Sequence, residues 1–187
     1  MDNCGDKVAL LGINKQYPES SIQNSVGFIG IYWFLDTRFW ILNLMLLGEY
    51  QHNLDVKGRM AIPAKFRDKL TAGAIITRGI DNCLFVFANN EWEILAKKLV
   101  ALPLAQANSR AFVRLMLAGA TDVELDNQGR ILIPDYLRKY AGLGKEAVVA
   151  GLYNRIEIWD KEAWAAYKVK TESSSEEIAE KLGELGI

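Results

Sequence analysis

The sequence contains few of the residues on which metal sites, disulfide scaffolds and many catalytic sites depend. Among 187 residues there is one histidine, His52, which excludes a histidine-rich metal site and a triad that uses several histidines. The two cysteines, Cys4 and Cys83, are too few for a disulfide framework, and we interpret them as free thiols of a reducing compartment. The formal net charge of −1 favours no class of partner by itself.

The remaining polar residues show no catalytic pattern. P-loop and Rossmann signatures are absent, and no nucleophile, base and orienting group stand at a recognisable spacing. Asp81, Asp122 and Glu124 are acidic but isolated from such partners. Cys83 lies in the apolar run CLFVF, which suits a small core residue better than a nucleophile. We therefore expect no enzymatic activity, no cofactor and no metal.

Residues 1–44 differ from the rest of the chain. Residues 26–47 form a long apolar run, VGFIGIYWFLDTRFWILNLMLL. Asp36 and Arg38 in the middle of this run would each cost about 2.5–3.5 kcal/mol at the centre of a membrane helix. The start of the chain also lacks the basic region of a signal peptide. We expect no membrane association, and we treat 1–44 as an extension outside the fold, disordered or translated from upstream of a natural start at Met45.

Charge is distributed unevenly along the chain. Residues 45–168 have a net charge of +3, and the tail from Val169 has a net charge of −3. Basic residues outnumber acidic ones in one short stretch near the start of the positive segment. The basic residues of this stretch are Lys57, Arg59, Lys65, Arg67 and Lys69. A local basic patch on a nearly neutral protein indicates an anionic partner.

A fourteen-residue repeat organises the chain from Met45 onward. Residues 54–67 read LDVKGRMAIPAKFR, and residues 125–138, 71 positions later, read LDNQGRILIPDYLR. Both fit L-D-x-x-G-R-x-x-I-P, with an arginine as the last residue. We expect an extension at 1–44, a first repeat at 45–102, a linker helix at 103–118, a second repeat at 119–170, and a C-terminal tail or helix at 171–187.

Each repeat begins with the same predicted elements. A short strand leads into a tight turn at Gly58 or Gly129, where glycine can adopt a positive φ. The next strand, RMAIP or RILIP, is almost continuously apolar, and we expect it to be covered on both faces. Pro63 and Pro134 end this strand and suit the first turn of a short helix.

Each repeat ends with a β-hairpin and an amphipathic helix. The helices contain Trp92 and Trp164 at matching positions, which we interpret as core or subunit-interface residues rather than base-stacking platforms. The N-cap candidates are Asn89 or Asn90 for the first helix and Asp160 for the second.

One repeat of about fifty residues is too small to bury a core alone. Two repeats can exchange strands and so remove each other's exposed edges. We therefore predict an α+β fold, mostly β, in which two β-β-α-β-β swapped-hairpin repeats, each followed by a helix, form one closed barrel with pseudo-twofold symmetry.

The D-x-x-G-R element permits two interpretations. In the structural one, Asp55 and Asp126 accept hydrogen bonds from turn amides and pair with Arg59 and Arg130. In the functional one, the arginines face outward and bind phosphate or the O6/N7 edge of guanine. Both can hold, because an exposed Asp–Arg pair is worth only about 0–1 kcal/mol and an arginine can leave it for a better anion.

The ordered set of motifs resembles the MraZ family, which belongs among the AbrB-like (SpoVT-AbrB) swapped-hairpin DNA-binding proteins. The resemblance covers 45–187, and residues 1–44 have no counterpart in it. It rests on LDVKGR…IPAKFR and LDNQGR…IPDYLR together with MLLGEYQHNLD, TRGIDNCLFVF, SRAFVR, LAGATDVELD and NRIEIWDKEAW.

The resemblance implies a cytoplasmic, nucleoid-associated transcriptional regulator. Such a protein would bind repeated elements of double-stranded DNA upstream of its own division and cell-wall gene cluster, as a ring of identical subunits. The D-x-x-x-R motifs would face the DNA, with Arg59 and Arg130 as principal contacts. Lys57 has Gln128 as its counterpart, so we expect the first repeat to contribute more to phosphate binding. The predicted DNA-binding residues are Asp55, Lys57, Arg59, Lys65, Arg67, Asp126, Arg130 and Arg138.

A protein-interaction module of the antitoxin type is the alternative. Antitoxins of the AbrB-like group usually have one copy of the repeat and a disordered tail, whereas this chain has two copies and a short tail. In that tail Ile178, Leu182 and Leu185 recur at helical spacing. Packing on a neighbouring subunit and a solvated, frayed helix both remain open for it.

Overall fold

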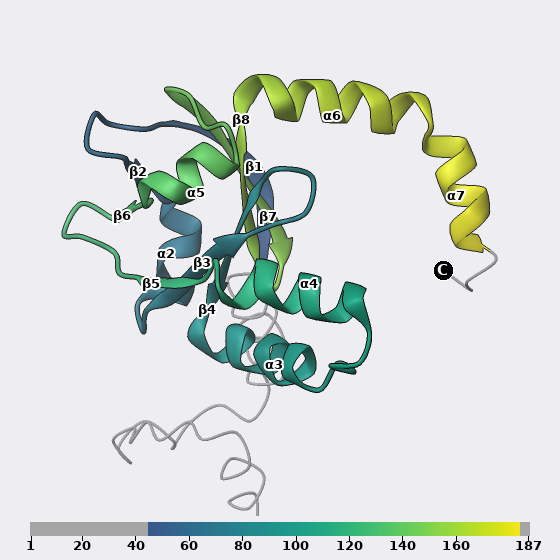
Figure 1. The fold of residues 1–187 in the computed structure, drawn as a ribbon. Helices are drawn as coiled ribbons and strands as arrows, with labels where there is room; N and C mark the ends of the chain where they lie inside the picture. The colour runs from purple at the N-terminus through teal and green to yellow at the C-terminus, as the bar shows by residue number, and fades with distance from the viewer. Residues whose placement is uncertain (1–44, 184–187) are drawn as a thin grey trace, which may run out of the picture. The chain divides into compact units, whose positions relative to one another are not determined.

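The structure is a computed structural model that describes residues 45–183 (Figure 1). The expectations for residues 1–44, including most of the apolar run, therefore lie outside the described residues, as does Leu185 of the tail. Within the described part of the chain, no helix is long and apolar enough to cross a membrane.

Six antiparallel strands form the main sheet in the order β1-β7-β8-β4-β3-β5, and two short strands form a separate ribbon, β2-β6. The first repeat supplies β1 (Leu46–Asn53), β2 (Arg59–Ala61), β3 (Ala74–Arg78) and β4 (Leu84–Ala88). The second repeat supplies β5 (Thr121–Val123), β6 (Arg130–Leu132), β7 (Glu146–Tyr153) and β8 (Ile156–Asp160).

The strand order is a palindrome between the two repeats. The opening strand of each repeat pairs with the hairpin of the other, β1 with β7 and β5 with β3, and β4 pairs with β8 at the centre. In the ribbon, Met60 of β2 lies opposite Ile131 of β6. These two residues occupy the same position in the two repeats. The predicted exchange of strands with pseudo-twofold symmetry is thus confirmed.

Each face of the sheet has its own apolar layer, because alternate residues of a strand point to opposite faces. On one face the ribbon and two short helices, α2 (Ala64–Leu70) and α5 (Asp135–Tyr140), cover the sheet. This layer contains side chains that are almost completely buried, among them Met60, Ile62, Phe66, Ile131, Ile133 and Leu137.

The other face packs against the longer helices α3 (Asn89–Val100), α4 (Ala107–Leu117) and the start of α6 (Lys161–Ser173). Phe85, Phe87 and Trp159 line the sheet here, and the half-buried Trp92 and Trp164 pack against them. Both helix tryptophans thus pack on the core of this chain, which is one of the two roles predicted for them. A last helix, α7 (Ser175–Gly183), follows α6 and buries none of its side chains.

The predicted closed barrel is wrong. Strands β1 and β5 lie at opposite ends of the six-stranded sheet and do not pair with each other. The two strands that could have joined these edges, β2 and β6, are three residues long and pair with one another instead. The repeats therefore close their core with a covering layer rather than with a continuous ring of strands.

Two smaller predictions also need correction. The second strand of the second repeat is covered on one face only, since Ile131 is buried whereas Leu132 is 54% exposed, and its counterpart in the first repeat, Ala61, is half-buried. Asn89 and Asn90 do not cap α3, because Ala88 occupies the cap position and the side-chain Nδ2 of Asn89 donates to the Ala72 carbonyl oxygen at 2.8 Å. Asp160 does cap α6 and accepts from the amide of Glu162, as predicted.

Candidate nucleic-acid interface

The first motif forms a tight turn held by its aspartate. The Gly58 amide donates to the Asp55 carbonyl oxygen at 2.9 Å, which closes a β-turn over Val56 and Lys57. One carboxylate oxygen of Asp55 accepts from the amides of Lys57 and Arg59 at 2.9 Å each. The other accepts from Arg59 Nε at 2.7 Å. The aspartate thus fixes both the turn and the arginine that follows it.

The second motif repeats this arrangement bond for bond. The Gly129 amide donates to the Asp126 carbonyl oxygen at 2.8 Å. The Asp126 carboxylate accepts from the amides of Gln128 and Arg130 at 2.9 Å and from Arg130 Nε at 2.8 Å. The structural interpretation of D-x-x-G-R is therefore confirmed in both repeats. We call these two segments, residues 55–59 and 126–130, the motif turns.

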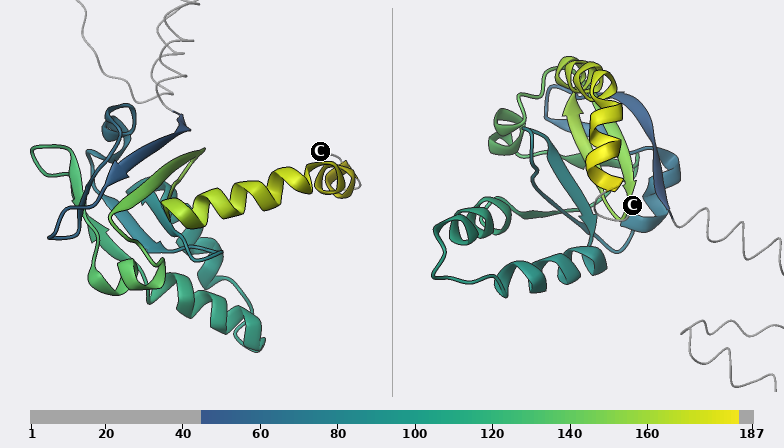
Figure 2. Two further views of the ribbon diagram at one scale, coloured as in Figure 1. Left: turned by 90° about the horizontal axis from the view of Figure 1, so that it is seen from above. Right: turned by 90° about the vertical axis from the view of Figure 1, so that its right-hand side faces the viewer.

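The motif turns are joined to each other as well. The Ile62 amide donates to the Gly129 carbonyl oxygen, and the Ile133 amide donates to the Gly58 carbonyl oxygen, both at 2.9 Å. Arg130 Nη1 also lies 3.6 Å from Asp55 Oδ2, so an ion pair crosses between the repeats. Each turn is thus anchored by the strand of the other repeat. The loops that contain them lie side by side at the end of the molecule away from α6 and α7 (Figures 1 and 2).

Two further arginines pack on the turn glycines of the opposite repeat. Arg138 of α5 lies over Gly58, where a Cβ would be 2.8 Å from its Cζ, and Arg67 of α2 lies over Gly129 in the same way. Both glycines have positive φ, 78° and 72°. Arg67 Nε also donates to the Ile62 carbonyl oxygen at 2.9 Å. Backbone conformation therefore favours glycine at both places, and a Cβ there would displace the guanidinium above it.

The hydrogen bonds of the motif turns lower the pKa of both aspartates. For Asp126, the Arg130 side chain is the main cause, helped by the Arg130 amide, and the pKa falls to about 2. For Asp55, the Arg59 amide is the main cause and the Arg59 side chain adds to it. Both carboxylates are therefore ionised at neutral pH, and each offsets part of the charge of the arginine beside it.

The predicted DNA-binding residues divide into two sets. The structure brings seven of them to the motif turns or onto their glycines, and these are Asp55, Lys57, Arg59, Arg67, Asp126, Arg130 and Arg138. Lys65 is the exception. Its Nζ donates to the Leu47 carbonyl oxygen at 3.3 Å, near the start of β1. Leu47 precedes Asp55 by eight residues of mostly extended chain, roughly 25 Å away.

Of the four residues at the tips of the turns, sequence reasoning named Lys57 as DNA-binding and overlooked Val56, Asn127 and Gln128. Val56 is fully exposed at 101%, and Lys57, Asn127 and Gln128 are also exposed. Their side chains form no hydrogen bond with any other residue in the described range. A signal was available in the sequence, because the two positions that lie between the aspartate and the glycine hold different residues in the two motifs.

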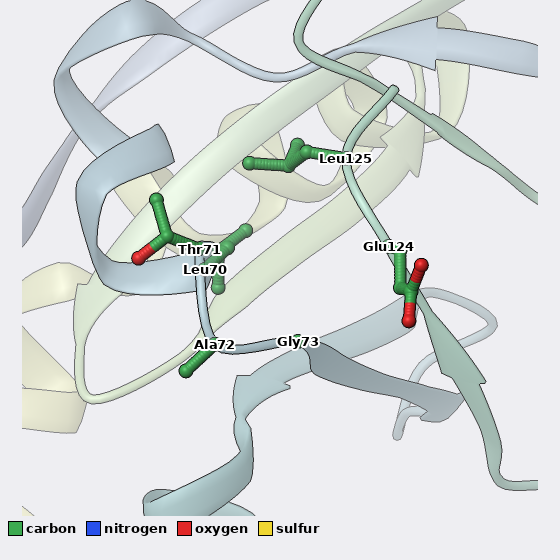
Figure 3. A pocket seen from close by; sticks show the side chains of 6 residues that line it. All are labelled: Leu70, Thr71, Ala72, Gly73, Glu124 and Leu125. Atoms are coloured by element: carbon green, nitrogen blue, oxygen red, sulfur yellow. The ribbon is translucent and has the colours of Figure 1, made fainter. Parts of the chain in front are cut away.

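A shallow hollow lies beside the chain that leads into the second motif turn (Figure 3). Strand β1 stays paired up to Asn53, and the Leu54 amide still donates to the Lys145 carbonyl oxygen at 2.8 Å. Strand β5 leaves β3 after Val123, which opens a space between two short segments of chain. The lining residues are Leu70, Thr71, Ala72, Gly73, Glu124 and Leu125. Glu124 is the single charged residue among them, so the lining selects no ligand class.

Within 45–183, no group of three or more histidine, cysteine, aspartate or glutamate side chains is placed to hold a metal ion. Burial raises the pKa of the Cys83 thiol, with the nearby Glu157 and Asp81 adding to the effect, so this thiol is held in its neutral form. It packs in the second apolar layer.

Comparisons with known proteins agree with this arrangement. The family model described as "MraZ protein, putative antitoxin-like" matches the chain twice, over residues 45–115 and 116–184. The Transcriptional regulator MraZ of Halothermothrix orenii is 52% identical over 143 residues, which are 76% of this chain and 100% of that protein. Proteins of the same name from Acetivibrio thermocellus and Desulforamulus reducens are 51% and 50% identical over 143 and 141 residues. The matches cover 76% and 75% of this chain and 100% and 99% of those proteins.

The family matches cover both motif turns and the strands that exchange between the repeats. The relatives are named as transcriptional regulators and not as enzymes, which agrees with the expectation of no enzymatic activity. With two family matches in tandem and relatives at about half identity over nearly their whole length, the chain belongs to the MraZ family.

Proposed function

We propose that this chain is a DNA-binding transcriptional regulator that contacts double-stranded DNA with its two motif turns. The single observation that supports this most is the joining of both turns into one surface, with the arginines of D-x-x-G-R in reach of solvent. The side chains of Arg59 and Arg130 keep 33% and 24% of their exposure despite their aspartate partners. An anionic phosphate can replace those partners at small cost, because each pair is solvated.

The DNA site in this proposal is a set of repeated elements upstream of the chain's own gene, in a division and cell-wall cluster. The protein acts in the cytoplasm on the nucleoid. The fourteen residues of the first motif have a net charge of +3 and those of the second a net charge of 0. Phosphate contacts therefore come mainly from the first repeat, and each chain neutralises few phosphates.

A ring of identical subunits compensates for weak binding by one chain. Several linked copies on repeated DNA elements gain affinity through effective concentration. The support within this chain is a set of exposed apolar residues on α6 and α7, two helices that extend away from the motif turns (Figure 2). These residues are Tyr167, Val169, Ile178 and Leu182. Replacing Ile178 and Leu182 with glutamate should lower the molar mass measured by light scattering and should weaken DNA binding without changing the motif turns.

The test of DNA binding is fluorescence anisotropy on a duplex from upstream of the gene, over a salt series. Arg59→Ala and Arg130→Ala should each weaken binding and reduce the salt slope by about one phosphate contact. Arg59→Lys keeps the charge but not the bidentate geometry, and should give an intermediate affinity. Lys97→Ala on α3 is the matched control and should bind like the parent. Unchanged binding by both alanine variants, at unchanged molar mass, would leave the motif as a structural clasp only.

An antitoxin-type interaction module is the second candidate, and the description of the matching family model favours it. In that case the motif turns would again bind DNA, and a partner protein would occupy another surface. Purification of the chain with the products of its neighbouring genes separates the two candidates. A stoichiometric protein partner that changes DNA affinity would support the module.

A further inference from the structure

The two motif turns are alike in their frame and unlike at their tips. The aspartate, the glycine and the arginine occur in both, with the same hydrogen bonds. The two positions between aspartate and glycine hold Val56 and Lys57 in the first turn and Asn127 and Gln128 in the second. Any difference between what the two turns recognise must therefore arise at these four side chains or farther from the turn.

The tips have a rigid backbone and free side chains. The amides of Lys57 and Gln128 are each held by a carboxylate oxygen of the preceding aspartate at 2.9 Å. The glycine that follows closes the turn in both cases. All four tip side chains are exposed, and they extend from the corner of the turn. A fixed main chain that presents unbonded side chains is a suitable arrangement for contact with base edges in a groove.

The chemistry of the two tips matches different bases. In the major groove, asparagine and glutamine can make paired hydrogen bonds to N6 and N7 of adenine. Lysine donates to O6 and N7 of guanine, and an apolar side chain such as valine contacts the methyl group of thymine. The amide tip thus offers both a donor and an acceptor, whereas the first tip offers only donors and an apolar surface.

We propose that the two tips read different bases, and this proposal rests on the proposed function. The tip Asn127–Gln128 selects adenine, and the tip Val56–Lys57 selects guanine with a neighbouring thymine. The arginines of the motif are held by their aspartates in both repeats and supply the same contacts to each half of the site. They position the chain, and the tips distinguish the halves.

This assignment has a geometric consequence. The frame of the motif turns is close to twofold symmetric, so the contacts of the two motif arginines alone would let the chain sit on DNA in either of two orientations. Unlike tips remove that ambiguity, because only one orientation places each tip on its own bases. The DNA element read by one chain is then asymmetric, although the protein frame around it is not.

The experiment transplants the tips and selects DNA. The full chain, the variant Asn127→Val/Gln128→Lys and the reverse variant Val56→Asn/Lys57→Gln are each used to select duplexes from a randomised pool. Lys97→Ala is the control and should select like the parent. All four proteins are first compared by thermal unfolding and by molar mass. Anisotropy on a duplex of unrelated sequence, over a salt series, gives the sequence-independent part of binding.

The parent should select an asymmetric element with adenine at one end and guanine at the other. Asn127→Val/Gln128→Lys should replace the adenine preference by guanine and make the element nearly symmetric. It should lose about 5- to 100-fold in affinity for the parent's element. It should also bind unrelated DNA somewhat more tightly, because it gains a lysine. The reverse variant should gain adenine at the other end and bind unrelated DNA more weakly.

Two results would overturn the proposal, and they differ. If the parent binds DNA in a salt-sensitive way but both transplants select the parent's element, the tips do not read bases while the proposed function stands. If the parent shows no salt-sensitive binding to any duplex, the proposed function fails and the tip assignment fails with it.

Discussion

The two repeats share the bonding of their motif turns and differ most in their opening strands and in their closing helices. The opening strand has eight residues in the first repeat and three in the second. The closing helix α3 packs with α4 in the first repeat, whereas its counterpart α6 buries no residue completely and leads into the exposed α7.

This comparison shows which parts of the repeat depend on the other copy. The motif turns, which are alike, contact each other through the hydrogen bonds to the carbonyl oxygens of Gly58 and Gly129, and β2 pairs with its own counterpart β6. Strands β1 and β5, which differ in length, do not pair with each other. A segment that must fit its own duplicate can change only when both copies change, and the outer strands and helices have no such restriction.

The largest expected effect comes from the centre of the shared frame. Met60 and Ile131 lie opposite each other in the ribbon and are 0% and 1% exposed. Met60→Ala and Ile131→Ala should each lower the free energy of unfolding by about 2–5 kcal/mol. The two values should be similar, because each residue fills the same space from its own side. Chemical denaturation measures both, and a cost below 1 kcal/mol for either would break the equivalence of the repeats.

Substitution of the turn glycines should lower the free energy of unfolding by a smaller amount. Alanine at Gly58 or Gly129 would have to adopt a positive φ and would press on the guanidinium of Arg138 or Arg67. We expect each substitution to cost about 1–3 kcal/mol of unfolding free energy. Gly142, which also has a positive φ but open space around its Cβ position, is the matched control and should cost less. Equal costs at all three positions would assign the effect to backbone conformation alone.

Low pH should reduce the stability that the hydrogen bonds of both motif turns provide. The contribution of Asp126 to this loss of stability should be measurable. Its folded pKa of about 2 lies below its ordinary value of 3.8, so its stabilising effect is complete above about pH 4 and is lost as the pH falls through 2. Asp55 is shifted in the same direction. Unfolding measured between pH 4 and 2 should show a shallower decline for Asp126→Asn than for the parent. Parallel curves would contradict this role of the carboxylate.

The smallest expected effect is that of removing residues 1–44. The family matches begin at residue 45, and relatives match over 99–100% of their length without this segment. The shortened chain from Met45 should therefore have the parent's unfolding midpoint, molar mass and DNA affinity. A change in affinity would show that the extension takes part in binding.

The sequence predicted much of the fold because the repeat indicates which strands must pair with each other. Two copies of one motif with a turn glycine between short strands led directly to the exchange of strands and to the Asp–Arg clasp. The prediction that the exchanged strands form a closed barrel was wrong. Periodicity cannot tell whether a three-residue strand such as β5 closes a ring or ends at an edge. The apolar run of β6 was misleading in the same way, because Leu132 lies on the solvent face.

Other features of the site depend on contacts between distant parts of the chain. Nothing local to Arg67 indicates that it lies over Gly129, 62 positions later. Lys65 looked like a member of the basic patch because it is close in sequence, but the helix turns its side chain toward Leu47. Three of the four tip residues, Val56, Asn127 and Gln128, were overlooked because they are not constant between the two motifs, and only the charge of Lys57 indicated a role.

The exchange of strands also affects how the chain folds during synthesis. Leu46 pairs with Tyr153, and every partner of β1 in the sheet lies in β7. The first repeat therefore leaves the ribosome with an unpaired edge strand and with half of its core missing, and must wait until nearly the whole chain has emerged. Such long-range pairing slows folding, because the loop must close before its contacts stabilise it. The same duplication that lets one chain present two turns together thus ties the folding of its first half to the completion of its second.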